Sequence, residues 1–287
     1  MAERRVLADD ALMFLMAQPS DAARHPDMLP RGSGLVGVEQ TVVCGLDAES
    51  RNEPIRFAAC LARRLGWGLS LVPLPEAATE DERLGRLLAA SARDQAGFVV
   101  SRAVGRGASA AALVELSRDA ACPLIAVPPG APALGTGPIL CGIASRGPLG
   151  ATARAASRLA NATGSRLRLV HVVSHAQPSE SAANGHGGVV WRALDTLDLA
   201  VPVDLVIDEG KPAERLGELG RQEAAALLAV GAPSGEAASP DGVVAAVLRE
   251  SQVPVMVVPG GTAASASPAN GRLYPWQRAL ATSRIVP

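Results

Sequence analysis

The chain has 287 residues, enough for two domains of ordinary size, and a formal net charge of −1. Nearly half of the residues are hydrophobic but only 2% are aromatic, which is typical of an aliphatic core between buried parallel strands and helices. The chain has no run of like charges and few rings to stack on bases. This composition argues against nucleic acid or an anionic membrane as a partner.

Lysine and cysteine usage exclude further classes. Lys211 is the only lysine and Pro212 follows it, so the Gly-Lys-Ser/Thr sequence of a phosphate-binding P-loop is absent. Schiff-base chemistry would also depend on this one side chain. The four cysteines form no CxxC pair, and we expect them to be buried apolar residues. The first residues resemble neither a signal peptide nor a membrane span, so a cytoplasmic location is expected.

The chain divides into five predicted parts. They are an N-terminal extension (1–40) with a short helix at 10–16, a first α/β domain (41–130), a proline-rich linker (131–138), a second α/β domain (139–260) and a C-terminal tail (261–287). The tail begins as an Ala/Ser/Pro/Gly stretch and ends with a cluster around Tyr274 and Trp276.

In both domains, apolar strands alternate with segments that carry apolar residues at helical spacing. The first domain has predicted strands at 41–46, 69–74, 98–100 and 123–127, and helices at 54–65, 80–95 and 108–121. The second has strands at 139–143, 167–173, 203–207, 226–230 and 254–258, and helices at 150–162, 188–197, 213–224 and 241–251. The alternation predicts two open parallel sheets, each with helices on both faces.

The two domains are unequal copies of one unit. The sequence pairs are Val42-Val43-Cys44-Gly45 with Ile139-Leu140-Cys141-Gly142, Leu61-Ala62 with Leu159-Ala160, Arg83-Leu84-Gly85 with Arg215-Leu216-Gly217, and Pro123-Leu124 with Pro254-Val255. The offset between the copies grows from 97 at the first pair to 131 at the last. The first copy therefore lacks about 34 residues, which predicts the loss of one strand and the helix before it.

These elements and motifs resemble the universal stress protein family in its tandem two-domain form. The resemblance covers roughly residues 41–260 and includes the second copy's Glu-Gly-Lys-Pro-Ala-Glu turn and its Leu-Leu-Ala-Val-Gly strand. It implies a Rossmann-like sheet of order 3-2-1-4-5 in each domain, with the first domain truncated. It also implies internal pairing of the two domains through their last strands, 124–127 and 255–258. A further homodimer is left open.

The resemblance also implies where a nucleotide would bind. Many members of the family bind ATP where the strand order reverses. They have an aspartate after strand one and, after strand four, a loop of the form Gly-x-x-Gly, nine residues, then Gly-Ser or Gly-Thr. Glycines let the backbone approach the phosphates, which accept N–H bonds at the next helix N-terminus.

The first copy keeps only part of this pattern. Asp47 matches the aspartate. The glycine loop is lost, with Ser101 assigned to the place of its first glycine and no room for the spacer. Arg102 and Arg106 could hold an anion, but solvated loop arginines are the simpler interpretation.

The second copy departs from the pattern in another way. Ala144 replaces the aspartate, and Gly231 and Gly235 are one residue too far apart. Asp241 and Gly242 stand in place of the Gly-Ser pair, with Val243 behind them. A carboxylate at a helix N-terminus is a good cap and would repel a triphosphate by about 4 kcal/mol per pair of unit charges at close range. We therefore expect Asp241 to displace nucleotide from this helix.

Other constellations are weaker. His171, His175 and His186 do not have metal-ligand spacing on a helix, and a structural role is expected for His171. No nucleophile and base can be paired. The sequence therefore predicts a non-enzymatic stress-response protein without cofactor, acting through protein interaction. The alternatives are an ATP or AMP sensor using the second copy and, least supported, a nucleotide hydrolase or transferase.

Overall fold

A computed structural model describes residues 40–46, 52–75, 79–103, 108–144, 149–173, 201–232 and 242–259. The predicted N-terminal extension before Gln40, the tail 261–287 and the predicted helix 188–197 lie outside these ranges. The described strands are β1 (Thr41–Leu46), β2 (Gly68–Pro73), β3 (Ala96–Arg102), β4 (Leu124–Val127), β5 (Ile139–Ile143), β6 (Leu167–Val173), β7 (Val203–Glu209), β8 (Leu227–Gly231) and β9 (Val255–Val258). The described helices are α2 (Glu53–Leu65), α3 (Glu80–Arg93), α4 (Ala108–Asp119), α5 (Leu149–Thr163), α7 (Pro212–Gln222) and α8 (Val243–Glu250).

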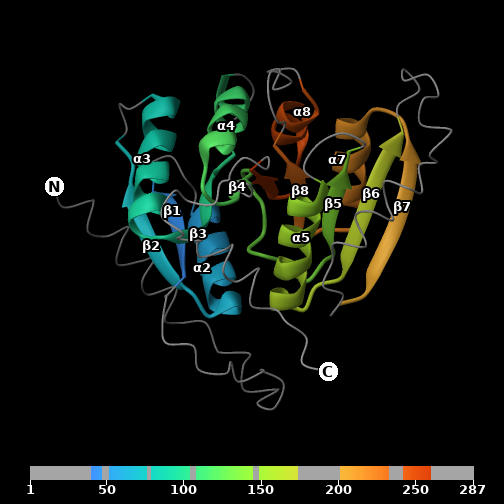
Figure 1. Ribbon diagram of the computed structural model, residues 1–287, viewed down its shortest axis with the longest axis horizontal. Helices are drawn as coiled ribbons and strands as arrows, with labels where there is room; N and C mark the ends of the chain where they lie inside the picture. The colour runs from blue at the N-terminus through green and yellow to red at the C-terminus, as the bar shows by residue number, and fades with distance from the viewer. Residues whose placement is uncertain are drawn as a thin grey trace, which may run out of the picture. The chain divides into compact units, whose positions relative to one another are not determined.

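The strands form one sheet in the order β2-β1-β3-β4-β9-β8-β5-β6-β7 (Figure 1). In the second repeat, β7-β6-β5-β8-β9 is the order 3-2-1-4-5 implied by the resemblance. The first repeat contributes β2-β1-β3-β4, the same order without its third strand. The α/β fold class is therefore confirmed, and among the described residues the first repeat has one strand fewer, as predicted.

The two repeats share a continuous sheet, joined through the last strands as the resemblance implies, whereas the alternation of elements alone suggested two separate sheets. All neighbouring strands within a repeat are parallel, but β4 and β9 pair antiparallel. Ile125 faces Met256 at the centre of this joint, and both are fully buried. The pairing satisfies backbone groups that each half-sheet would otherwise expose at its edge, which is why the halves fuse.

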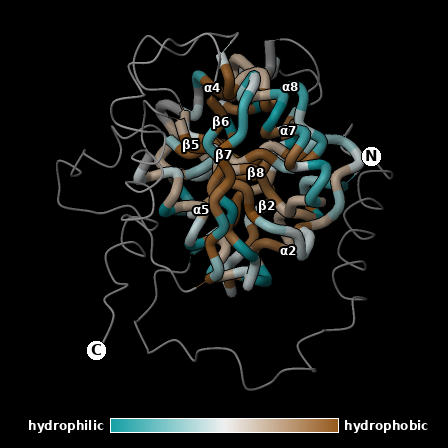
Figure 2. The backbone as a smooth tube through the Cα atoms, turned by 90° about the vertical axis from the view of Figure 1, so that its right-hand side faces the viewer, coloured by the Kyte–Doolittle hydropathy of each residue, from teal (hydrophilic) through white to brown (hydrophobic). Residues whose placement is uncertain are grey.

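Two helical layers cover the sheet. Helices α2 and α5 pack on one face with the core around Phe57, Leu61 and Leu159, and α3, α4, α7 and α8 pack on the other. Figure 1 shows α3, α4, α8 and α7 in the upper part of the view and α2 and α5 below them. In Figure 2 the strands are mostly brown and the helices carry the teal, hydrophilic residues outward. Both faces of the sheet are therefore buried at its central strands, as expected for parallel strands, while the edge strands β2 and β7 stay partly exposed.

Local signals in the sequence fix the helix ends. Pro54 stands in the first turn of α2, and Gly66 ends that helix in the left-handed conformation, with φ of 67°. Thr79 and Glu82 form a capping box at the start of α3, each side chain accepting a hydrogen bond from the other residue's backbone N–H.

The predicted linker is part of the core. Ala131 is 7% exposed and Leu134 4%, and both belong to the cluster under α2 and α5. The Gly130 N–H donates to Glu53 and the Arg64 guanidinium donates to the Gly135 carbonyl. This segment joins the repeats as packed structure rather than as a spacer between independent domains.

The structure corrects the correspondence between the repeats in the middle of the chain. Gln95 and Ala224, 129 positions apart, have nearly the same unusual φ, 49° and 47°, at the turn before the fourth strand. Val99 and Leu228 share the same register position, also 129 apart. The pairing of Arg83-Leu84-Gly85 with Arg215-Leu216-Gly217, at an offset of 132, is therefore wrong.

A close approach of helix to strand supports the corrected offset. A Cβ added to Gly45 would meet Leu74 at 2.8 Å and Leu87 at 3.3 Å, and one added to Gly142 would meet Leu216 at 3.1 Å. Leu87 and Leu216 lie 129 positions apart. Both repeats thus use a glycine in their first strand, β1 or β5, to let the helix α3 or α7 pack closely against the sheet.

Candidate nucleotide crevices

The fold defines two places where a ligand of an open α/β sheet would bind. Strand order reverses between β1 and β3 in the first repeat and between β5 and β8 in the second. Ligands of such sheets lie beyond the carboxyl ends of the strands at this reversal. Because β4 and β9 are antiparallel, the two sets of strands run in opposite directions. The two crevices therefore open at opposite ends of the sheet, and one ligand cannot use residues of both.

In the first crevice, β3 ends in Arg102, whereas the equivalent strand of the second repeat, β8, ends in Gly231. The Ala103 N–H donates to the Val127 carbonyl at 2.7 Å, and the Ala232 N–H donates to the Val258 carbonyl at the same distance. This makes Ala103 equivalent to Ala232, so Arg102 is equivalent to Gly231. The assignment of Ser101 to this position was wrong by one residue, because the strand pairing and not the loop sequence sets the register.

The arginine changes the shape of the first crevice. A glycine here lets the backbone approach a phosphate, whereas Arg102 brings a half-buried side chain. The connection to the last strand is also shorter. It runs from Arg102 to Leu124, 22 positions, against 24 from Gly231 to Val255. Asp47, Gly105, Arg106 and Gly107 lie outside the described residues, so their predicted roles stay predictions.

In the second crevice, the glycine is kept and the carboxylate is missing. Ala144 follows β5 and is exposed, so no acidic side chain stands at the end of this strand. Gly231 ends β8, and Ala232 behind it is fully buried. Gly235 and Asp241 lie outside the described residues, and the anionic role predicted for Asp241 remains untested.

Helix α8 begins later than predicted. Its N-cap is Gly242, in extended conformation with φ of −68° and ψ of 166°, and the cap has no side-chain hydrogen bond. Val243 follows with 45% of its surface exposed. The N-cap position thus belongs to Gly242 and not to Asp241, because the chain enters the helix one residue further on.

His171 has a structural position. It is 3% exposed in β6, and its Nδ1 lies 2.9 Å from the Ile143 carbonyl oxygen at the end of β5. A buried hydrogen bond of this kind fixes the strand ends beside the crevice. Within the described ranges, no group of three or more His, Cys, Asp or Glu side chains could hold a metal ion. His175 and His186 lie outside them.

Three of the four cysteines are buried as expected, whereas Cys60 is only partly buried. Cys44 and Cys141 occupy equivalent places in β1 and β5 and are at most 1% exposed. Burial raises the pKa of the Cys122 and Cys141 thiols to about 12. Thiols held in the protonated form are poor nucleophiles, so these two residues serve as core side chains.

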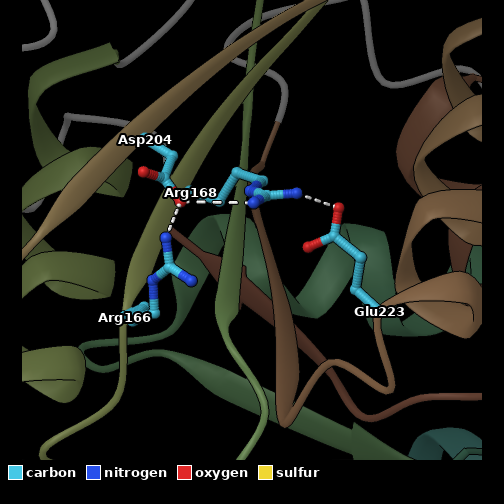
Figure 3. A network of polar contacts seen from close by, with 4 residues as sticks. All are labelled: Arg166, Arg168, Asp204 and Glu223. Carbon is cyan, nitrogen blue, oxygen red and sulfur yellow. Dashed lines mark hydrogen bonds and ion pairs between the residues drawn. The ribbon is translucent and has the colours of Figure 1, made fainter.

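Charged residues gather at the opposite end of the second repeat. Arg168 in β6 contacts both Asp204 of β7, at 3.2 Å, and Glu223 at the end of α7, and Arg166 also reaches Asp204, at 2.6 Å (Figure 3). Burial by itself lowers the pKa of the Arg168 guanidinium, but Asp204 and Glu223 together raise it above its ordinary value. Sequence reasoning missed this network, although an arginine inside an apolar strand signals it. It lies at the amino ends of the strands, away from the crevice.

The comparisons agree with this architecture. Residues 135–259 match the model described as "Universal stress protein family". A universal stress protein from Archaeoglobus fulgidus DSM 4304 is 13% identical with a TM-score of 0.59, over 78% of this chain and 99% of that one. A functionally unknown protein from Pseudomonas aeruginosa PAO1 is 15% identical with a TM-score of 0.50, over 78% and 83%. No curated protein matches the sequence.

The two kinds of similarity support different statements. At such low identity the solved structures show the fold alone. The matched family covers the second repeat from the linker to the end of β9. The second repeat is a domain of the universal stress protein family, and the first repeat shares its architecture without one strand. None of the helices in the described part of the chain is long and apolar enough to cross a bilayer.

Proposed function

We propose that this chain is a non-enzymatic universal-stress-type protein that acts through protein interaction, and that neither crevice binds ATP tightly. The observation that carries the proposal is the register position of Arg102. It places a long side chain where the backbone would have to approach a phosphate. The second crevice supports it through Ala144, which cannot accept hydrogen bonds as a carboxylate would.

A nucleotide sensor is the second candidate, and the second crevice favours it. Gly231 is present at the end of β8, and the Gly242 cap leaves the first N–H groups of α8 without a side-chain acceptor from the cap residue. Such groups attract anions at helix N-termini. A hydrolase or transferase has less support, because the hydroxyl–carboxylate pair of Ser70 and Asp94 joins β2 to the end of α3 and does not lie at the carboxyl ends of the strands.

Thermal unfolding with millimolar ATP separates these candidates. A ligand at about one hundred times its dissociation constant adds about 2.7 kcal/mol to the free energy of unfolding. We expect no measurable increase of the melting temperature with ATP or AMP. The matched variant is Gly231→Arg, which gives the second repeat the residue of the first. A shift in the natural chain that disappears in Gly231→Arg would overturn the proposal and establish the sensor.

A further inference from the structure

The missing strand leaves β2 at the edge of the sheet. In the second repeat, the equivalent strand β6 pairs in parallel with β7 over seven positions, from Leu167 to Val173. In the first repeat, no strand within the described ranges pairs with the outer side of β2. The second repeat therefore shows that this edge can pair with a further extended strand.

Equivalent leucines show how far the neighbouring strand β7 changes the burial of β6 relative to β2. Val42 pairs with Leu69 and Ile139 pairs with Leu167, which makes Leu71 equivalent to Leu169. Leu169 lies opposite Leu205 of β7 and is 1% exposed, whereas Leu71 is 38% exposed. Both strands lie under a helix that packs on the same face, α2 or α5. Leu71 thus exposes the surface that Leu169 buries, since no described strand lies beside β2 on its outer side.

The outer side of β2 also presents backbone groups. The Gly68 N–H donates to Gln40 and the Leu74 N–H donates to Leu46, both on the side of β1. Because hydrogen-bonding direction alternates along a strand, Leu69 and Leu71 direct their N–H and C=O groups away from β1. Pro73 has no N–H to offer.

The two edges of the sheet differ in charge. The outer strand β7 carries Asp204, Asp208 and Glu209, and charges of this kind oppose the addition of another strand. Strand β2 has the sequence GLSLVP, without a charged residue. Both edge strands expose a leucine, Leu71 of β2 and Leu205 of β7. Only β7 also carries charged residues, so β2 is the edge without this protection.

We propose that β2 is the contact between two copies of this chain, which pair antiparallel through it and continue the sheet across a two-fold axis. A second copy fits because β2 resembles the strand that fills the equivalent edge of the second repeat. In β7, the strand that pairs with β6, Leu205 and Ile207 are apolar residues two positions apart, and in β2 Leu69 and Leu71 have the same spacing. A two-fold contact between identical edges satisfies both strands at once. The β4–β9 joint shows that this sheet continues through an antiparallel pair. The inference does not depend on the state of either crevice.

Light scattering after gel filtration of the full chain tests this contact. We expect the mass of a dimer at micromolar concentration for the natural chain. Leu71→Lys places a charge on the outer strand at a position that is already partly exposed, and should yield a monomer with unchanged circular dichroism. Ile207→Lys makes the same change on β7, where Ile207 is 55% exposed, and should leave the dimer intact.

Each other outcome contradicts the proposal. A monomeric natural chain, or a dimer that persists in a folded Leu71→Lys variant, would show that β2 is not the contact. Dissociation by Ile207→Lys alone would assign the contact to the opposite edge. Should Leu71→Lys fail to fold, Leu71→Ser supplies the same test with a smaller, uncharged side chain.

Discussion

The two repeats make the same tertiary link with different chemistry. In the first repeat, the Ser70 hydroxyl donates to the Asp94 carboxylate at 2.7 Å. In the second, Arg168 and Glu223 occupy the equivalent positions and form an ion pair. Both pairs join the second strand to the end of the helix before the fourth. What the duplication has kept is therefore the place of the contact, while the residue types have changed.

The comparison also shows where the repeats remain alike. The joint is nearly symmetric, because Leu124 faces Val257 and Ala126 faces Val255 around the central pair of Ile125 and Met256. All four residues of β4 and all four of β9 are apolar and buried. The repeats are thus most similar where they contact each other and least similar at the crevices and outer edges.

The largest effect is expected at the joint. Met256→Ala and Ile125→Ala each remove a fully buried side chain, and each should lower the free energy of unfolding by about 2–5 kcal/mol. Because the two positions are equivalent, the losses should be similar. Urea unfolding followed by circular dichroism measures them, with Val243→Ala as the exposed control. A negligible loss at either position would mean that the repeats do not depend on this contact.

A smaller difference is expected between the two polar links. Arg168→Met leaves Glu223 without this partner and should cost about 1–3 kcal/mol, whereas Ser70→Ala removes one hydrogen bond and should cost about 0.5–1.5 kcal/mol. The Arg168 side chain is 25% exposed and that of Glu223 19%, so water weakens the ion pair. Equal losses in urea unfolding would contradict the view that the charged link is the stronger one.

The smallest effect concerns acid stability, to which one carboxylate of each repeat contributes. Arg93 and then Ser70 lower the pKa of Asp94, and Arg215 lowers the pKa of Asp208. Because the pKa of each carboxyl group is lower in the folded chain, the unfolded chain binds more protons as the pH falls. Each carboxylate therefore stabilises the fold above the ordinary pKa of 3.8, and this stabilisation is lost as the pH falls through the folded pKa.

Unfolding in urea at pH 7 and pH 3 measures this contribution. Asp94→Asn and Asp208→Asn should each reduce the difference in stability between the two pH values. Glu214→Gln changes a carboxylate whose side chain is 58% exposed and serves as the control. An unchanged difference in both aspartate variants would contradict the assignment.

The sequence predicts the fold well because the apolar periodicities are strong. The predicted strands 41–46, 139–143 and 167–173 coincide with β1, β5 and β6, and the boundaries of the other described elements differ by at most two residues. The periodicity alone does not predict the fusion into one sheet, because short apolar strands such as Leu124–Val127 look the same in a separate sheet and in a joint; only the family resemblance implied pairing through the last strands. The prediction that 131–138 is a linker between separate domains is also wrong, since a proline-rich composition does not reveal that Leu134 is buried.

The candidate site is less predictable than the fold. Loop spacing suggested Ser101 as the counterpart of the glycine, but strand pairing assigns Arg102. An offset that changes from 98 to 129 and then to 131 along the chain cannot be read from short similar motifs, as the false match at Arg83 shows. The ion-paired network around Arg168 depends on contacts between residues 36 and 55 positions apart.

The buried segment between the repeats has a consequence for how the chain could be divided. Severing the backbone near Leu134 would give two fragments, each with a bare apolar strand, β4 or β9, and each lacking part of a shared core. Such fragments would be expected to recover their structure by complementing each other rather than by folding alone. The two repeats therefore form a single folding unit, because each needs the other to pair its last strand and to complete the core.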